Sequence, residues 1–265
     1  MIKLGALARE ARSVANALQK EGMAEPVGPL TVSGMLAEQL AKELSAGAED
    51  GAVVVADDPS GARAPAAIRV IAGDPSPEDD AFVRAAERGE IPVVIVQLWP
   101  QAEWRAPFVL SPFVVECKTG EGFPLATIAS LVGKAADDPT ALAARVPILK
   151  GPVERSARRD SLVRSALIAL TAGRSRSARP LLALEQVNLV SQLRALEEPV
   201  AARDDRPQVV AATAAAAIAA SYGMREVARR APRILPRRLS DAAVAAVGTW
   251  LLAEVFRRLD ARGIV

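Results

Sequence analysis

Residues 91–134 constrain the fold of this chain more than any other part of its sequence. Two apolar runs, Ile91–Leu98 and Phe113–Cys117, are typical of buried strands, and a glycine-containing turn leads from the second run into a helical pattern over Pro124–Ala136. Strands that are apolar on both faces and alternate with helices favour a sheet of mostly parallel strands. The sequence therefore predicts an α/β fold for this part of the chain.

The preceding residues extend the same alternation. Residues 76–88 carry a clear helix start, because Ser76 can cap the helix, Pro77 fits its first position and acidic residues fill its first turn. Residues 33–46 are also predicted to be helical, with Ser33 as the N-cap. The remaining elements predicted in this half are an amphipathic helix over residues 2–21 and strands at Val53–Ala56 and Ile68–Ala72.

From residue 139 onward the sequence contains helical patterns without a convincing strand. Prolines separate the stretches with helical periodicity, because a proline cannot continue a helix that precedes it. The predicted helices cover residues 139–145, 152–172, 181–198, 207–230 and 239–261. We therefore expect an α/β domain over residues 1–145, followed by an all-α helical domain over residues 146–265.

The charges of the chain divide unequally between its two halves. Residues 1–149 contain 13 basic and 20 acidic residues, a net charge of −7, whereas residues 150–265 contain 20 basic and 11 acidic residues, a net charge of +9. An arginine-rich half can bind nucleic acid, anionic lipid, an acidic protein or the acidic half of the same chain. Nucleic acid is the weakest of these candidates, because aromatic residues are scarce in this half and no nucleic-acid-binding motif is visible.

The composition removes most catalytic chemistry. The chain contains no histidine, so it lacks Ser–His and Cys–His pairs and the commonest metal ligand. Its single cysteine, Cys117, ends an apolar strand and is interpreted as a core residue rather than a nucleophile. The acidic pairs Asp57/Asp58 and Asp79/Asp80 are interpreted as cap and turn residues. We therefore predict no catalytic residue, no metal ligand and no cofactor.

The central strands and the turn that follows them resemble the middle of a small GTPase domain. In that family a strand of the form PVIVV leads to Asn-Lys-x-Asp, and the next strand ends in Ser-Ala-Lys before a Thr-Gly-Glu-Gly turn and a helix. Here IPVVIVQ matches the first strand and VVECKTGEGFPLATI matches the second, with Glu116-Cys117-Lys118 in place of Ser-Ala-Lys. The resemblance implies a GTPase-like α/β domain.

The residues that bind nucleotide in that family are missing from this chain. After VVIVQ the sequence continues as LWPQ, which has no acid that could accept hydrogen bonds from a guanine base. No G-x-x-x-x-G-K-[ST] motif is present, so the phosphate-binding lysine and the Mg²⁺-binding hydroxyl are absent. The resemblance therefore implies a degenerate, non-catalytic domain. An atypical nucleotide-binding protein that uses Gly28–Gly34 with Asp57 and Asp58 is an alternative.

The second half resembles the helical domain of the DUF697 type, which is often fused to, or encoded beside, bacterial GTPases. The shared features are an L-L-A-L-x-Q-x-x-L-V helix, matched by LLALEQVNLV at residues 181–190, a break at Tyr222-Gly223 and a late helix with Gly248-Thr249. Together the two resemblances imply a bacterial, actinobacterial-type family that joins a degenerate GTPase-like domain to this helical domain.

A membrane-associated protein, anchored or docked through residues 207–258, is a further alternative. Val209–Ala220 carries no charge, but this run is shorter than the ~20 residues that a bilayer-spanning helix needs. Asp241 and Glu254 interrupt the apolar part of the last helix. Docking of the arginine-rich half on an anionic membrane surface is the milder form of this alternative.

The sequence favours a non-catalytic regulatory or scaffold protein that acts through protein–protein interaction, with a GTPase as a candidate partner. Trp99 and Trp104 flank WPQAEW, which is either an exposed binding loop or a cap on the core. The first residues lack the uninterrupted apolar run of a signal peptide, so we expect a cytoplasmic location, at most peripheral to the inner membrane. The predicted interaction surface consists of Trp99, Trp104, Arg229, Arg230, Arg233, Arg237 and Arg238.

Overall fold

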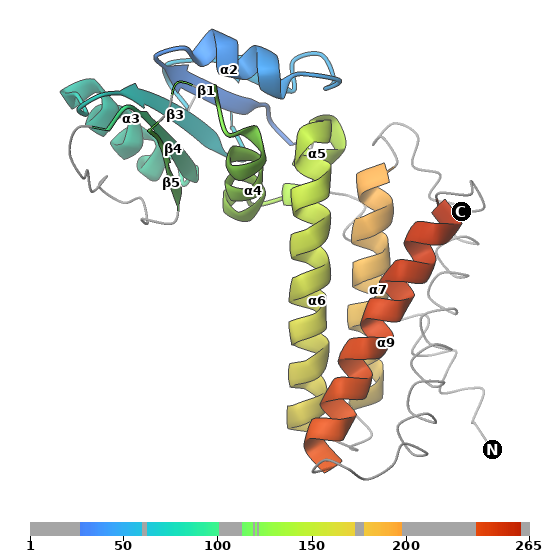
Figure 1. The fold of residues 1–265 in the computed structure, drawn as a ribbon. Coiled ribbons are helices and arrows are strands. Elements are labelled where there is room, and N and C mark those ends of the chain that lie inside the picture. Colours follow the sequence, from blue (N-terminus) through green and yellow to red (C-terminus); the bar gives the residue numbers. More distant parts are fainter. Residues whose placement is uncertain are drawn as a thin grey trace. The chain divides into compact units, whose positions relative to one another are not determined.

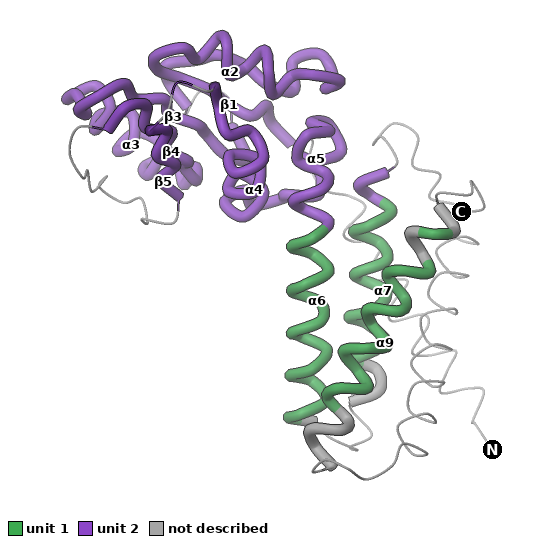
Figure 2. Tube along the Cα trace, viewed as in Figure 1, with its two compact units in different colours: residues 1–24, 155–194, 202–265 green, residues 25–154, 195–201 purple. Residues whose placement is uncertain are grey.

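The computed structural model describes residues 27–59, 63–100, 113–118, 120, 122–172, 178–197 and 237–260. The chain divides into two compact units (Figure 2). The first, here called the α/β unit, comprises residues 25–154 and 195–201, and the second, the helical unit, comprises residues 1–24, 155–194 and 202–265. The helices predicted at residues 2–21 and 207–230 lie outside the described residues.

The α/β unit is built around a parallel sheet with the strand order β2-β1-β3-β4-β5 (Figure 1). Each pair of neighbouring strands is parallel, and the register places Val32 of β1 beside Ile68 of β3. β3 and β4 are buried along nearly their whole length, as expected of strands that are covered on both faces. The predicted α/β fold with a parallel sheet is therefore confirmed. The strands are β1 (Leu30–Gly34), β2 (Val53–Val55), β3 (Ala67–Ala72), β4 (Val93–Leu98) and β5 (Val114–Cys117).

Helices pack against this sheet and complete its aliphatic core. They are α2 (Ala37–Leu44), α3 (Pro77–Arg88), α4 (Leu125–Ala135) and α5 (Pro139–Arg145), and the 3-10 turn η3 (Pro147–Leu149) follows them. Phe82 of α3 is buried in a cluster with Ile71 and Ile95 of the sheet. α2 lies against β1 and α4 lies against β4, with Leu40 and Ile128 fully buried. The helix predicted at residues 139–145 is confirmed.

The start of α3 has the cap that the sequence predicts. The Ser76 hydroxyl accepts a hydrogen bond from the Asp79 backbone N–H at 3.3 Å, and the Asp79 carboxylate accepts one from the Ser76 backbone N–H at 2.8 Å. This reciprocal pair is a capping box, with Pro77 at the first helical position. The prediction that Asp79 is a cap residue is therefore confirmed.

The start of the α/β unit differs from the prediction. Leu30–Gly34 form β1, and helix α2 begins only at Ala37, so the helix predicted over residues 33–46 is present but its predicted start and its N-cap Ser33 are wrong. The physical reason is that β1 pairs with a strand on each side, and the buried Ser33 hydroxyl binds a neighbouring strand instead of helix N–H groups. The N-cap of α2 is Leu36, whose side chain makes no capping hydrogen bond.

The described part of the helical unit consists of three helices (Figure 1). They are α6 (Lys150–Ala172), whose first residues belong to the α/β unit, α7 (Ala178–Glu197), whose last residues belong to it as well, and α9 (Arg237–Asp260). These bounds agree within three residues with the helices predicted at residues 152–172, 181–198 and 239–261. Among the described residues, no helix combines the length and apolar character that crossing a bilayer requires.

The direction of α9 follows from its contacts with α6. Ala242 and Ala245, near the start of α9, pack with Ala169, near the end of α6. Further along α9, the Thr249 hydroxyl donates a hydrogen bond to the Ser165 hydroxyl at 3.0 Å. Moving forward on α9 therefore means moving backward on α6, and the two helices are antiparallel neighbours.

Candidate functional site

The carboxyl ends of the parallel strands lie together at one edge of the sheet, here called the carboxyl edge. In the strand order, β2 lies on one side of β1, and β3, β4 and β5 follow on the other side. In doubly wound sheets with this order, ligands bind outside the carboxyl ends of the strands where the order reverses, which here are β1 and β3. The carboxyl edge is therefore where a functional site is expected.

The connection from β1 to α2 is short and tightly held at this edge. Gly34 has a φ of +95°, and a Cβ at this position would overlap the carbonyl oxygen of Val70 in β3. The Met35 N–H donates a hydrogen bond to that same oxygen at 3.1 Å. Only glycine fits here, because its backbone must approach the neighbouring strand closely at a positive φ.

The residues that follow Gly34 are apolar and exposed. Met35 is 56% exposed and Leu36 is 45% exposed, and Leu36 has a φ of 57°, which is unusual for a bulky residue. The stretch Gly28–Gly34 that the nucleotide-binding alternative requires is mostly strand β1, so it does not form a glycine loop in front of a helix. The position where a doubly wound sheet commonly binds its ligand is occupied by apolar side chains.

Trp99 shares these properties at the end of β4. Trp99 is 47% exposed and has a φ of 48°, and its backbone N–H donates a hydrogen bond to the Cys117 carbonyl oxygen at 2.9 Å. We call Met35, Leu36 and Trp99 the carboxyl-edge patch. The other predicted tryptophan, Trp104, lies outside the described residues.

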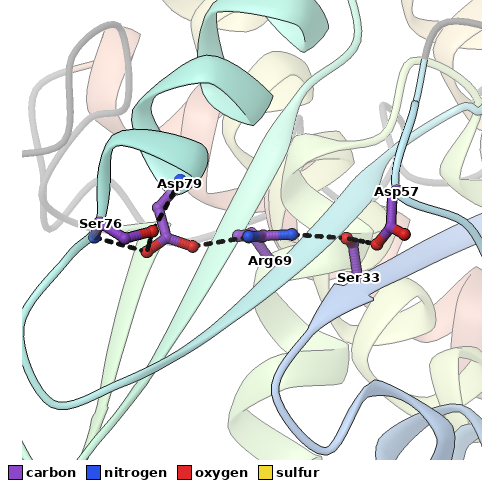
Figure 3. Close-up of polar contacts among 5 residues, drawn as sticks. All are labelled: Ser33, Asp57, Arg69, Ser76 and Asp79. Atoms are coloured by element: carbon purple, nitrogen blue, oxygen red, sulfur yellow. Dashed lines mark hydrogen bonds and ion pairs between the residues drawn. The ribbon is translucent and has the colours of Figure 1, made fainter.

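A buried polar network lies within the sheet close to this edge (Figure 3). At its centre, Arg69 of β3 donates from Nε to Asp79 Oδ1 at 2.8 Å and from a terminal nitrogen to the Ser33 hydroxyl at 2.7 Å. The Ser33 hydroxyl in turn donates to Asp57 Oδ1 at 3.2 Å. The network therefore connects α3, β3, β1 and the residues after β2.

The residues of the network supply hydrogen-bond partners for one another in the protein interior. The side chains of Arg69 and Asp79 are only 10% and 8% exposed, so each charge requires the other. The Arg69 guanidinium also lies over the ring of Phe82, 5.1 Å from its centre. Ser33 is fully buried, and Asp57 is the exposed member that solvent reaches. The arrangement acts as a structural clamp between the strands and α3.

Cys117 lies at the end of β5 and is buried. Burial raises the pKa of its thiol above the ordinary value, because an apolar environment disfavours the thiolate. A nucleophilic cysteine requires the opposite shift, since the thiolate is the reactive form. The interpretation of Cys117 as a core residue is therefore confirmed.

The predicted arginine surface falls mostly outside the described residues. Arg229, Arg230 and Arg233 lie outside them, and Arg237 and Arg238 are the first two residues of α9, with side chains that are not described. The predicted grouping of these arginines with Trp99 therefore stays a prediction. Within the described part of the chain, no group of three or more histidine, cysteine or acidic residues could hold a metal ion.

Sequence reasoning missed the polar network and two members of the carboxyl-edge patch. The available signal was Arg69 itself, because a charged residue within the apolar run AIRVIA requires a buried partner. Its partners could not be named without the register that pairs Ser33 with Arg69. Met35 and Leu36 were not predicted to form an exposed surface, because the predicted helix over residues 33–46 included them.

Searches of protein families, curated proteins and solved structures found no match to this chain.

Proposed function

We propose that the chain is a non-catalytic regulatory or scaffold protein that binds a partner protein through the carboxyl edge of its α/β unit. The proposal includes a degenerate GTPase-like domain over residues 1–145, an all-α helical domain over residues 146–265, a cytoplasmic location and a GTPase as the partner. It rests on the residues of the carboxyl edge and on the motifs discussed above.

The carboxyl-edge patch is the observation that carries the proposal. Leu36 and Trp99 are bulky, about half exposed and held at positive φ, a conformation that is unfavourable for such residues by roughly 1 kcal/mol or more. Exposed apolar side chains in strained backbone conformations are typical of surfaces that contact another molecule. The strands that lead to them are separated only by β3, a lateral distance of about 10 Å, and β4 extends two residues beyond the level at which β1 ends.

The chemistry of the same edge argues against a nucleotide there. A phosphate site at a strand-to-helix connection presents backbone N–H groups from a glycine-rich loop, usually with a lysine. Here the connection is Gly34-Met35-Leu36, and two of its three residues carry exposed apolar side chains. Such side chains favour a protein surface rather than a charged phosphate group.

Photo-crosslinking in cells tests the proposal. A photoreactive amino acid at Met35 should give one discrete adduct, and a Trp99→Ser substitution should reduce it, because both residues belong to the same patch. Glu90, an exposed residue just before β4 and so at the opposite edge of the sheet, is the matched control position. An equal adduct from Glu90, or none from Met35, would contradict the proposal, and mass spectrometry of the adduct decides whether the partner is a GTPase.

A thermal-shift assay with GTP, GDP and ATP plus Mg²⁺ tests the non-catalytic part separately. A ligand that binds the native state raises the melting temperature by mass action. We expect no change with any of the three nucleotides. A stabilisation of several degrees would instead favour the atypical nucleotide-binding alternative.

A further inference from the structure

The helix α9 carries two apolar faces of different character. Its buried face is made of small residues, among them Ala242, Ala245 and Ala253, together with the buried Thr249. Its exposed face carries large apolar side chains that recur at helical spacing. These are Val247 at 56%, Trp250 at 51%, Leu251 at 49% and Val255 at 51% exposure. A helix of a water-soluble bundle normally buries its large residues and exposes its polar ones, so α9 has the reverse arrangement.

The neighbouring helices share this reversal where they lie beside the first half of α9. Leu167 on α6 is 53% exposed, and Leu181 and Leu184 on α7 are also exposed. The buried positions nearby are polar: Ser161, Ser165, Gln186 and Thr249 are at most 1% exposed. Small and polar residues between helices, with large apolar residues outside, are typical of helices that pack within lipid.

The exposed apolar side chains lie mostly toward one end of the helical unit, with Val163 and Val255 just beyond it. Further along α7, Leu189 and Leu193 are buried in the ordinary way. The end at which α6 finishes and α7 and α9 begin is different, and we call it the apolar end. It is defined by residues 165–172 of α6, 181–184 of α7 and 242–253 of α9, which contain no charged residue. The α6 part alone measures about 12 Å along its axis.

Charged and aromatic residues mark the two borders of the apolar end. On one border, Arg164 of α6 forms an ion pair with Glu185 of α7 at 2.9 Å. Trp250 lies at the same level, because the adjacent Thr249 bonds to Ser165, the neighbour of Arg164. Tryptophan is enriched where a protein passes from the apolar to the aqueous side of a membrane interface.

The other border of the apolar end is basic in sequence. Arginines occupy positions 174 and 176 between α6 and α7, position 179 at the start of α7, and positions 237 and 238 at the start of α9. Acidic residues are absent from residues 173–184. Arginines that flank an apolar segment can reach phosphate headgroups while the apolar residues remain among the acyl chains.

We propose that the apolar end of the helical unit docks into the surface of an anionic lipid membrane. The helices lie along the membrane surface with their exposed apolar side chains inserted, so that Trp250 at one border and the arginines at the other both meet the headgroup layer. The charge-free part of α6 is too short to cross the ~30 Å hydrocarbon layer, so the protein lies in one leaflet. Lipid is favoured over a protein partner because three different helices expose apolar side chains there and arginines border them.

A matched pair of substitutions on α6 tests this proposal. Leu167 and Val163 lie one helical turn apart and are 53% and 51% exposed, but only Leu167 belongs to the apolar end. Purified full-length protein is floated with vesicles of phosphatidylcholine alone and with vesicles that also contain phosphatidylglycerol. We expect the wild-type protein to bind the anionic vesicles and Leu167→Glu to bind them at least about tenfold more weakly, since a buried charge opposes insertion. Val163→Glu should remain within about twofold of wild type.

Further measurements keep the proposal falsifiable. Circular dichroism and thermal melting must show that both variants are folded, which is expected because both positions are exposed. Fluorescence of Trp250, in a chain whose other tryptophans are replaced by phenylalanine, should shift to the blue when anionic vesicles are added. The proposal is overturned if the wild-type protein does not bind, if both substitutions weaken binding equally, or if sedimentation shows that Leu167→Glu instead abolishes self-association.

Discussion

The two units of this chain place their large apolar side chains differently. In the α/β unit, strands β3 and β4 bury isoleucine, valine and leucine, while the exposed large apolar residues gather chiefly at the carboxyl edge. In the helical unit, Ser161, Ser165, Gln186 and Thr249 are buried, and large apolar residues from Val163 to Val255 are exposed. Both halves are rich in apolar residues, so apolar content alone cannot distinguish them. The difference teaches that the placement of large side chains, rather than their number, identifies the environment for which a surface is suited.

The largest expected effect is on the buried ion pair of the α/β unit. An Arg69→Met substitution leaves the Asp79 carboxylate buried without its partner at 2.8 Å, which should lower the free energy of unfolding by about 3–5 kcal/mol. Urea denaturation, followed by Trp99 fluorescence in a chain with Trp104→Phe and Trp250→Phe, measures this unit. The double variant Arg69→Met/Asp79→Leu should regain part of the loss, since it removes both charges but also the capping bonds that Asp79 accepts from Ser76. A loss below about 1 kcal/mol in the single variant would mean that water reaches the pair.

A smaller effect is expected at the tight connection of the carboxyl edge. A Gly34→Ala substitution places a Cβ against the Val70 carbonyl oxygen at a φ of +95°, so we expect a loss of about 3 kcal/mol from overlap and backbone strain together. Gly51 has a φ of +71° with open space around it, so Gly51→Ala should lose only about 1 kcal/mol. The same fluorescence assay compares them. Equal losses would show that strain alone matters and that β1 can move away from β3.

The helical unit offers a direct contrast between two buried serines. Ser165 bonds to Thr249 at 3.0 Å, so Ser165→Ala should lower the free energy of unfolding by about 1 kcal/mol. The Ser161 hydroxyl is buried and has no hydrogen-bond partner among the described residues, so Ser161→Ala should be neutral or stabilising. Denaturation followed by Trp250 fluorescence, with the other tryptophans replaced, measures the unit. If Ser161→Ala destabilises as much as Ser165→Ala, the buried polar layer is more fully hydrogen-bonded than its geometry indicates.

The smallest effect concerns the pH dependence that Cys117 contributes. Burial raises the pKa of the thiol above 9.0, so the folded state holds its proton more tightly than the unfolded state. The contribution to stability is therefore complete below pH 9.0 and is lost as the pH rises through the folded-state pKa. Cys117→Ala should reduce the loss of stability between neutral and alkaline pH, as measured by urea denaturation. An unchanged pH profile would show that the thiol is accessible to water.

Local signals in the sequence were sufficient for elements with strong caps or long apolar runs. The Ser76 cap, Pro77 and the acidic first turn located α3, and the run Val93–Leu98 is apolar enough to be recognised as a strand. β1 was missed because Ser33 and Gly34 look like a helix start when read alone, and only pairing with β2 and β3 makes them a strand. Tertiary contacts overrode local preference there.

The candidate site depended even more on long-range contacts. Trp99 was named from the sequence because it flanks WPQAEW, which could be either an exposed binding loop or a cap on the core. The positive φ of Leu36 and the partners of Arg69 depend on how strands that are distant in sequence meet. Such features become visible only when the register of the sheet is known.

The hydrogen-bond network of Ser33 limits which amino-acid substitutions this protein can accept during evolution. A serine hydroxyl has one hydrogen, and because Arg69 donates to Ser33, that hydrogen is available for Asp57. Each bond in the series therefore has a fixed direction, and no member can be exchanged for a residue of different donor capacity by itself. We expect relatives of this chain to replace positions 33, 57, 69 and 79 together or to keep all four. Substitutions at these four positions would then be coupled in evolution.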